Sequence, residues 1–237
     1  MKLPKTYFGK SIEGALDKYL EGAKNPQNGN DQEQDGQTSS LEGVDEGDFV
    51  YLPKNRLYVS KERRHLNKNW FDAHKALHNE GYRMLTLSEF VDFLNALRNG
   101  TEELKTIYDD ITEVRDPVRG EWIDADFKVV NSQLQMNYNH RIVDGELKPH
   151  TSGPLTNYLA TNKTPGISLD EWLSKPTSEG LPRANIRDGN LYYWALGKDN
   201  NSVARFSADS DGANLDCDWI PQYSNSRLGV RVAKIKV

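Results

Sequence analysis

The chain has 237 residues and a formal net charge of −5 at pH 7. This charge argues against a nucleic-acid partner, because a protein that binds nucleic acid needs a basic stripe on its surface. Cys217 is the single cysteine, so an intramolecular disulfide and a cysteine-rich zinc site are both excluded. No window approaches about 18 apolar residues and the first residues lack a signal-peptide core, so we expect cytoplasmic synthesis, no signal-peptide export and no membrane insertion.

The chain is predicted to begin with a helical segment over residues 1–22, because Ile12 and Leu16 start a helical apolar spacing. Residues 23–48 contain almost nothing to bury, and such a composition does not offset the entropy of ordering. We therefore expect a flexible polar linker or loop there. The folded domain is predicted over residues 49–237.

The first half of this domain alternates strands and helices. The pattern predicts strands in "NRLYVSK" and "YRML" and helices in "NWFDAHKALHNEG", "TLSEFVDFLNALRNG" and "EELKTIYDDI". The second of these helices has the clearest signal, because Thr86 and Glu89 have the spacing of a capping box and Gly100 follows its end. Gly81 is the expected C-cap of the first.

Beyond Arg115 the pattern changes to short β runs separated by Gly, Pro, Asn and Asp, with one helical turn around "SLDEWLS". Two helices followed by many strands indicate an α+β domain. We expect two helices flanking a small, mainly antiparallel sheet with long loops and insertions, which is where binding residues tend to lie.

Two histidines have the spacing of metal ligands. His74 and His78 lie four residues apart on a predicted helix, but Lys75 stands where a zincin has Glu, and the sequence offers no third ligand. We interpret them as surface or boundary histidines. Cys217 is interpreted as a buried structural residue, because the Asp residues on either side of it raise a thiol pKa.

Four aspartates near the C-terminus suggest a second metal hypothesis. Asp209, Asp211, Asp216 and Asp218 are hard oxygen ligands, yet their spacing does not match an EF-hand loop. A metal-dependent enzyme that uses this cluster remains an alternative.

The stretch from Ser207 to Ser226 contains no Lys, Arg, Glu, His, Thr or Met. Period-two alternation predicts a buried frame, formed by Phe206, Ala208, Ala213, Leu215, Cys217, Pro221, Leu228 and Val230. The outward set is predicted to be Asp209, Asp211, Gly212, Asn214, Asp216, Asp218, Trp219, Ile220, Tyr223 and Asn225, flanked by Tyr192, Tyr193 and Ser207. Exposed aromatics with small polar residues are typical of a paratope, and an ordinary solvated loop has a similar composition.

The order of three motifs adds a family resemblance. "YRMLTLSEFVDFLNAL" and "NSRLGVRVAK" resemble segments of C-type lectin domains of the formylglycine-generating-enzyme type. "YYWALGKDNNSVARF", followed by a polymorphic stretch and "LGVRVAK", resembles the variable proteins of diversity-generating retroelements, of the type carried by an archaeal virus. The resemblance covers residues 49–234 and implies a C-type-lectin-like fold.

In that family, adenine-directed mutagenesis rewrites chosen codons, many of them for Asn, without creating a stop. This process accounts for the absence of Lys, Glu and Met between Ser207 and Ser226, whereas Trp219 is not reachable from an Asn codon in this way. The chain lacks the cysteine pair of formylglycine-generating enzymes and the sugar-binding motifs of classical lectins, so the resemblance extends to the fold alone.

The resemblance implies a ligand-binding protein on a virion surface, with a hypervariable region at about residues 190–237. Its expected partner is a protein or glycan on a host cell surface. We expect no enzyme activity, no cofactor and no bound metal, and the sequence leaves the oligomeric state open. A structural virion subunit remains a further alternative.

Overall fold

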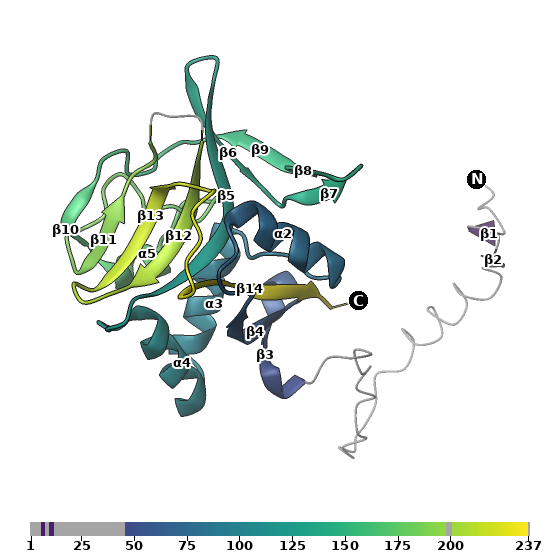
Figure 1. Ribbon diagram of the computed structural model, residues 1–237, viewed down its shortest axis with the longest axis horizontal. Coiled ribbons are helices and arrows are strands. Elements are labelled where there is room, and N and C mark those ends of the chain that lie inside the picture. Colours follow the sequence, from purple (N-terminus) through teal and green to yellow (C-terminus); the bar gives the residue numbers. More distant parts are fainter. Residues whose placement is uncertain (1–5, 8–9, 12–45, 198–200, 237) are drawn as a thin grey trace, which may run out of the picture. The chain divides into compact units, whose positions relative to one another are not determined.

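A ten-stranded sheet forms the centre of the C-terminal part of the chain, and the computed structural model in Figure 1 describes residues 6–7, 10–11, 46–197 and 201–236. The main path of the sheet has the order β10-β11-β13-β12-β5-β14-β4-β3, while β6 pairs with β5 and β9 pairs with β6. The bounds are β3 Phe49–Leu52, β4 Leu57–Arg64, β5 Arg119–Val130, β6 Gln133–Tyr138, β9 Thr151–Pro154, β10 Lys163–Ile167, β11 Leu191–Trp194, β12 Ser202–Ala208, β13 Ala213–Trp219 and β14 Leu228–Ile235.

The first strands of the sheet along the chain, β3 and β4, lie on the same side of it as the last strand, β14. Strand β14 pairs antiparallel with β4, and at Leu228 and Gly229 it also pairs in parallel with β5. Figure 1 shows the yellow β14 beside the blue β3 and β4. The second parallel pair is β11 with β13, so the sheet is mixed.

Four helices accompany the sheet in the described part of the chain: α2 Trp70–Asn79, α3 Leu87–Arg98, α4 Glu102–Thr112 and α5 Leu169–Ser174. The predicted capping box of α3 is present, because Thr86 Oγ1 accepts from the Glu89 amide and the Glu89 carboxylate accepts from the Thr86 amide. In the described residues, no helix combines the length and apolar character needed to cross a membrane.

Apolar side chains cover both faces of the central strand β5. Ile123 belongs to one buried cluster with residues of α3 and α5, whereas the preceding Trp122 belongs to a second cluster with Trp70 and Leu77 of α2. Successive strand residues point to opposite faces, so α2 and α3 lie on opposite sides of the sheet. This double coverage explains why the first seven residues of β5 are all buried.

An ionic group holds β14 against β5 where their backbone pairing is short. Arg231 donates to both carboxylate oxygens of Glu121, at 2.9 and 3.1 Å, and Arg119 lies 2.8 Å from the same carboxylate. Arg231 also donates to the carbonyl oxygens of Ser60 and Lys61 in β4. Burial alone would raise the pKa of Glu121, but the arginines hold that pKa below its ordinary value.

Two further strand pairs lie outside the ten-stranded sheet. Strands β7 (Arg141–Val143) and β8 (Glu146–Lys148) pair with each other outside the large sheet. In a separate N-terminal unit, β1 (Thr6–Tyr7) pairs with β2 (Lys10–Ser11). The other residues of the predicted N-terminal helix, and the polar segment as far as residue 45, lie outside the described residues. Glu46–Asp48 form a 3₁₀ turn.

The mixed α and β composition and the mainly antiparallel pairing agree with the prediction, but the sheet is large rather than small, and it contains two parallel pairs. It is large and mixed because β14 and β13 each add a parallel pair and because the chain ends enlarge one side of it. Besides the two helices of the predicted fold, α4 and α5 form at the helix predicted in "EELKTIYDDI" and at the helical turn predicted around "SLDEWLS". The predicted strand in "YRML" reduces to a single bridge between Arg83 and Ala233, since the chain turns at once into the cap of α3.

Candidate functional site

The buried frame predicted for the C-terminal stretch is confirmed. Its members are all buried: Phe206, Ala208, Ala213, Leu215, Cys217, Pro221, Leu228 and Val230. Leu215 and Cys217 lie in the same core cluster as α3. Burial and the neighbouring carboxylates of Asp216 and Asp218 raise the pKa of the Cys217 thiol well above its ordinary value, which fits a structural residue.

The predicted outward face is divided by β13 into two separate ends. Asp209, Asp211 and Gly212 form the turn before the strand, whereas the exposed residues of the next segment begin at Asp218. Seven extended residues span roughly 23 Å, so these two ends do not form one surface. The sequence pattern predicts one common face because period-two alternation does not show where a strand begins and ends.

Between these ends, the alternation fails for two predicted outward residues. Asn214 and Asp216 are buried, at 8% and 3% exposure. The reason is the position of β13 inside the sheet, where β11 and β12 lie on either side, and the Trp194 indole of β11 donates to Asn214 Oδ1 at 3.3 Å. Arg205 donates to Asp216 at 2.7 and 3.0 Å, yet burial still raises the pKa of Asp216 above its ordinary value.

The remaining predicted positions near β13 are also corrected. Gly212 is buried, and among the flanking residues Tyr193 and Ser207 are buried while Tyr192 is half-buried. The Tyr193 hydroxyl donates to the Leu159 carbonyl oxygen at 2.9 Å, which directs this ring into the core.

The segment after β13 does form an exposed patch. We define the β13–β14 loop patch as Asp218, Trp219, Ile220, Tyr223 and Asn225. Asp218 is exposed, and Ile220 and Tyr223 are 62% and 39% exposed, whereas Trp219 and Asn225 are half-buried. Trp219 and Tyr223 meet edge to face with ring centroids 5.4 Å apart. Large exposed apolar side chains on an ordered loop are a typical feature of an interaction site.

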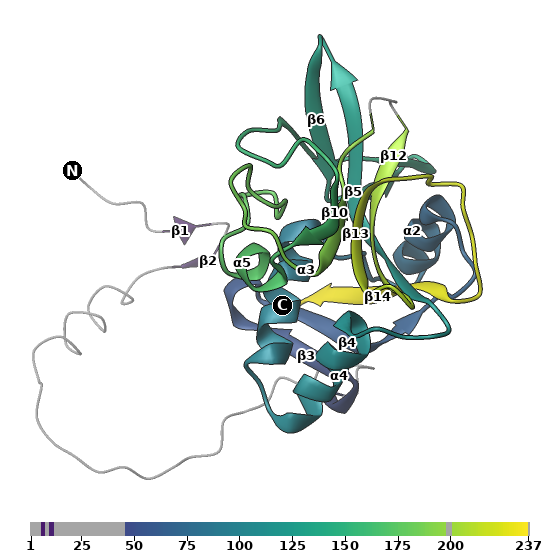
Figure 2. The same ribbon diagram turned by 90° about the vertical axis from the view of Figure 1, so that its left-hand side faces the viewer.

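Backbone hydrogen bonds and one stacking contact hold the loop that carries the patch. The Pro221 carbonyl oxygen accepts from the Trp70 amide at 3.0 Å, and the Asn225 carbonyl oxygen accepts from the Asn67 amide at 3.2 Å. The Arg205 guanidinium stacks on the Trp219 ring, 3.4 Å from its centroid. Figure 2 shows the yellow loop between β13 and β14 passing beside α2. These contacts fix the backbone without using the exposed side chains of Ile220 and Tyr223.

The four aspartates of the alternative metal hypothesis do not converge on one point. Asp209 Oδ1 accepts from the amides of Asp211 and Gly212 and so caps a turn, whereas Asp216 is paired with Arg205. In the described residues, three metal-type ligands converge only at His74, Asp124 and His140. The aspartates therefore do not form a shared metal site in this fold.

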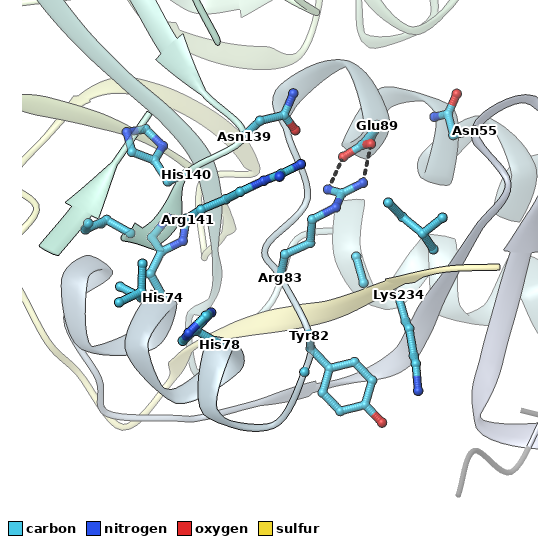
Figure 3. Close-up of a pocket in the computed structure, with 15 residues that line it drawn as sticks. Asn55, His74, His78, Tyr82, Arg83, Glu89, Asn139, His140, Arg141 and Lys234 are labelled. Carbon is cyan, nitrogen blue, oxygen red and sulfur yellow. Dashed lines mark hydrogen bonds and ion pairs between the residues drawn. The ribbon is translucent and has the colours of Figure 1, made fainter. Parts of the chain in front are cut away.

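A cavity of about 710 Å³ lies apart from the β13–β14 loop patch. Figure 3 shows several basic side chains that line it: His74, His78, Arg83, His140, Arg141 and Lys234. Arg83 makes a bidentate ion pair with Glu89, with nitrogen–oxygen distances of 2.6 and 2.7 Å. Arg141 has no acidic partner in the described part of the chain, so the lining is basic in balance.

Three distant segments bring His74, Asp124 and His140 together beside this cavity, which the two histidines line. His74 comes from α2, Asp124 from β5, and His140 follows β6. His140 Nδ1 lies 2.5 Å from Asp124 Oδ1, and His74 Nε2 lies 3.7 Å from the same oxygen. His74 is thus not a surface or boundary residue. Its neighbours of metal-ligand type are Asp124 and His140, and not His78. The only sequence signal was the single histidine pair on α2.

The two histidines have opposite pKa shifts. Burial lowers the pKa of His74 to about 4. Burial would also lower the pKa of His140, but its hydrogen bond with Asp124 and the nearby negative charge of Asp126 raise that pKa to about 9. At neutral pH, therefore, His140 carries a charge that the two aspartates balance, while His74 is neutral.

Comparisons with known proteins do not assign the chain to a family. No family model matches it, and no curated protein and no solved structure is significantly similar to it.

Proposed function

We propose that this protein is a ligand-binding module that uses the β13–β14 loop patch to bind a protein or glycan on a cell surface. The observation that carries the proposal is the exposure of Ile220 and Tyr223 on a loop whose backbone is held by α2. Aromatic side chains give contact area at low entropic cost, and Asp218 and Asn225 add adaptable polar groups around them.

We further propose that the domain has a C-type-lectin-like fold and belongs to the variable proteins of diversity-generating retroelements. A virus would carry it on the virion surface for host attachment. What supports this proposal is the separation of roles in the C-terminal stretch. Leu215, Cys217 and Leu228 are buried in the core, whereas Asp218, Ile220 and Tyr223 are exposed and can change without removing core contacts. Within the patch, Trp219 is half-buried against the second cluster. A diversified protein needs this separation, because most of its variants must still fold.

Sequencing this gene from many individuals of one population tests the diversification. We expect amino-acid changes to concentrate at Asp218, Ile220, Tyr223 and Asn225, with none at Leu215. Changes spread evenly along residues 49–236 would contradict the proposal. Changes at the buried Asn214 and Asp216 would show instead that diversification extends into the strand.

Binding is tested separately with fluorescently labelled protein and intact cells from the same population. The variant with Asp218→Ser, Ile220→Ser and Tyr223→Asn should bind at least about tenfold less, equivalent to about 1.4 kcal/mol. Asp211→Ser is the matched control, because this residue is exposed at the opposite end of β13. If both proteins bind equally, the patch is not the binding site.

A further inference from the structure

The cluster of His74, Asp124 and His140 plays no part in the proposed binding function, and its chemistry is that of a metal site. Its three ligand atoms all lie within 4.8 Å of one another, and all three residues are buried. Two imidazoles and one carboxylate form a ligand set that proteins use for first-row divalent metals.

One ligand atom is unused within the protein. His74 Nε2 is buried and has no hydrogen-bond partner, although it lies 3.7 Å from Asp124 Oδ1. Buried polar atoms are rarely left unpaired, and each exception asks for an explanation such as an ion. A cation between His74 and Asp124 would accept the lone pair of His74 Nε2.

The other two ligands are already oriented by groups behind them. Asp124 Oδ2 accepts from the His140 amide at 2.9 Å, which leaves Oδ1 turned toward the histidines. His140 Nε2 faces Asp126 Oδ2 at 3.8 Å, and Asn137 donates to the other oxygen of Asp126 at 2.5 Å. A carboxylate behind a histidine fixes its tautomer and orientation, as is usual for metal-ligating histidines.

We propose that His74 Nε2, Asp124 Oδ1 and His140 Nδ1 bind one divalent first-row transition metal ion. Ligands at about 2.0–2.2 Å from a tetrahedral ion lie about 3.3–3.6 Å apart. The three ligand atoms now lie within 4.8 Å of one another, so they need to shift by only about 1 Å. The ion replaces the proton that His140 Nδ1 and Asp124 Oδ1 share. Three protein ligands leave at least one coordination position for another molecule.

That open position faces the basic cavity. His74 and His140 both line the cavity of about 710 Å³, and Figure 3 shows the Arg141 side chain extending into it from the same side. A metal ion beside the unpaired guanidinium of Arg141 favours an anionic ligand, such as a carboxylate or a phosphate. The site would thus take a small anion on the metal, away from the β13–β14 loop patch.

The metal is tested on the full chain, prepared without a histidine tag and analysed by mass spectrometry for metal content. We expect about one first-row metal per chain after incubation with Zn²⁺ and gel filtration. Titration with Co²⁺ should give visible absorption bands of a four- or five-coordinate ion, which Zn²⁺ removes. Absence of saturable Co²⁺ and Zn²⁺ binding overturns the proposal, and this result does not depend on any variant folding.

Variants then assign the ligands. His74→Gln should weaken Co²⁺ binding by more than about a hundredfold, and Asp126→Asn by about 10–100-fold as a positioning residue. His78→Gln is the matched control, since His78 is exposed one turn further along α2 and lines the same cavity. Equal binding by His74→Gln and the wild type, or equal loss in His78→Gln, would overturn the assignment.

The open position is tested by adding inorganic phosphate or acetate to the Co²⁺ protein. Either anion should shift the absorption bands, and Arg141→Ala should weaken the apparent affinity for the effective anion. The two anions separate phosphate from carboxylate preference. Unchanged bands with both anions would overturn the open position and leave a closed structural metal site.

Discussion

The β13–β14 loop patch and the buried polar groups of this protein are built in opposite ways. The patch comes from one continuous segment, residues 218–225, and Asp218, Ile220 and Tyr223 in it are exposed to solvent. The His74–Asp124–His140 cluster and the Arg119–Glu121–Arg231 group each join several segments inside the protein. Exposed side chains on one continuous segment can be substituted without loss of core contacts. A buried polar group, in contrast, is stable only while each of its partners is present.

The largest effect should follow from breaking the buried ionic group. Glu121→Gln removes the negative charge that contacts both Arg231 and Arg119 and should destabilise the fold by about 3–5 kcal/mol, measured by urea unfolding. Glu171→Gln breaks a comparable contact with Arg187 at the surface and should cost far less, because water replaces that contact. Equal effects in the two variants would remove the contrast between buried and exposed groups.

Leu215→Ala should cost about 2–5 kcal/mol, because it leaves a cavity beside a side chain that is fully buried. The measurement is the free energy of unfolding, and Ile220→Ala is the exposed control on the same stretch. Ile220→Ala should change this free energy by less than about 0.5 kcal/mol. A silent Leu215→Ala would mean that the frame and the patch are reversed.

Two aspartates on one strand sharpen the boundary between the regions. Asp216→Ala leaves Arg205 without its carboxylate partner and should cost about 1–3 kcal/mol. Asp218→Ala, two residues further along, removes an exposed side chain and should change stability by less than about 0.5 kcal/mol. If the two variants are equally stable, the boundary does not lie between these positions.

Acid should remove part of the stability that Glu121 provides. A carboxyl group with a lowered pKa in the folded state stabilises the fold above its ordinary value of 4.5, and that contribution is lost as the pH falls through the lower folded value. The difference in unfolding free energy between the wild type and Glu121→Gln should therefore be constant near neutral pH and shrink below about pH 4.5. A difference that grows on acidification would contradict the lowered pKa.

The smallest change in stability should come from the patch itself. The variant with Asp218→Ser, Ile220→Ser and Tyr223→Asn should shift the melting temperature by at most a few degrees, because each exposed change costs less than about 0.5 kcal/mol. Differential scanning calorimetry measures the shift, with Leu215→Ala as the destabilised reference. Unfolding of the triple variant would show that the patch belongs to the core.

The helices and the buried frame were readable because they depend on local rules. Capping at Thr86 and Glu89 and the apolar spacing of α3 are set by neighbouring residues, so the periodicity located that helix. Leu215 and Cys217 are apolar or weakly polar residues in an alternating strand, and their burial follows directly from the pattern.

The sequence by itself determined the mixed helix and strand content, the capped helix α3, the buried frame and the exposed residues at the end of β13. Only the tertiary structure decided that β13 lies inside a large mixed sheet, so that Asn214 and Asp216 are buried and the predicted face is divided. Only the tertiary structure brought Asp124 and His140 to His74. The physical reason is that periodicity reports which side of an element is covered by its own neighbours in sequence, whereas contacts between distant segments depend on how the strands are ordered in space.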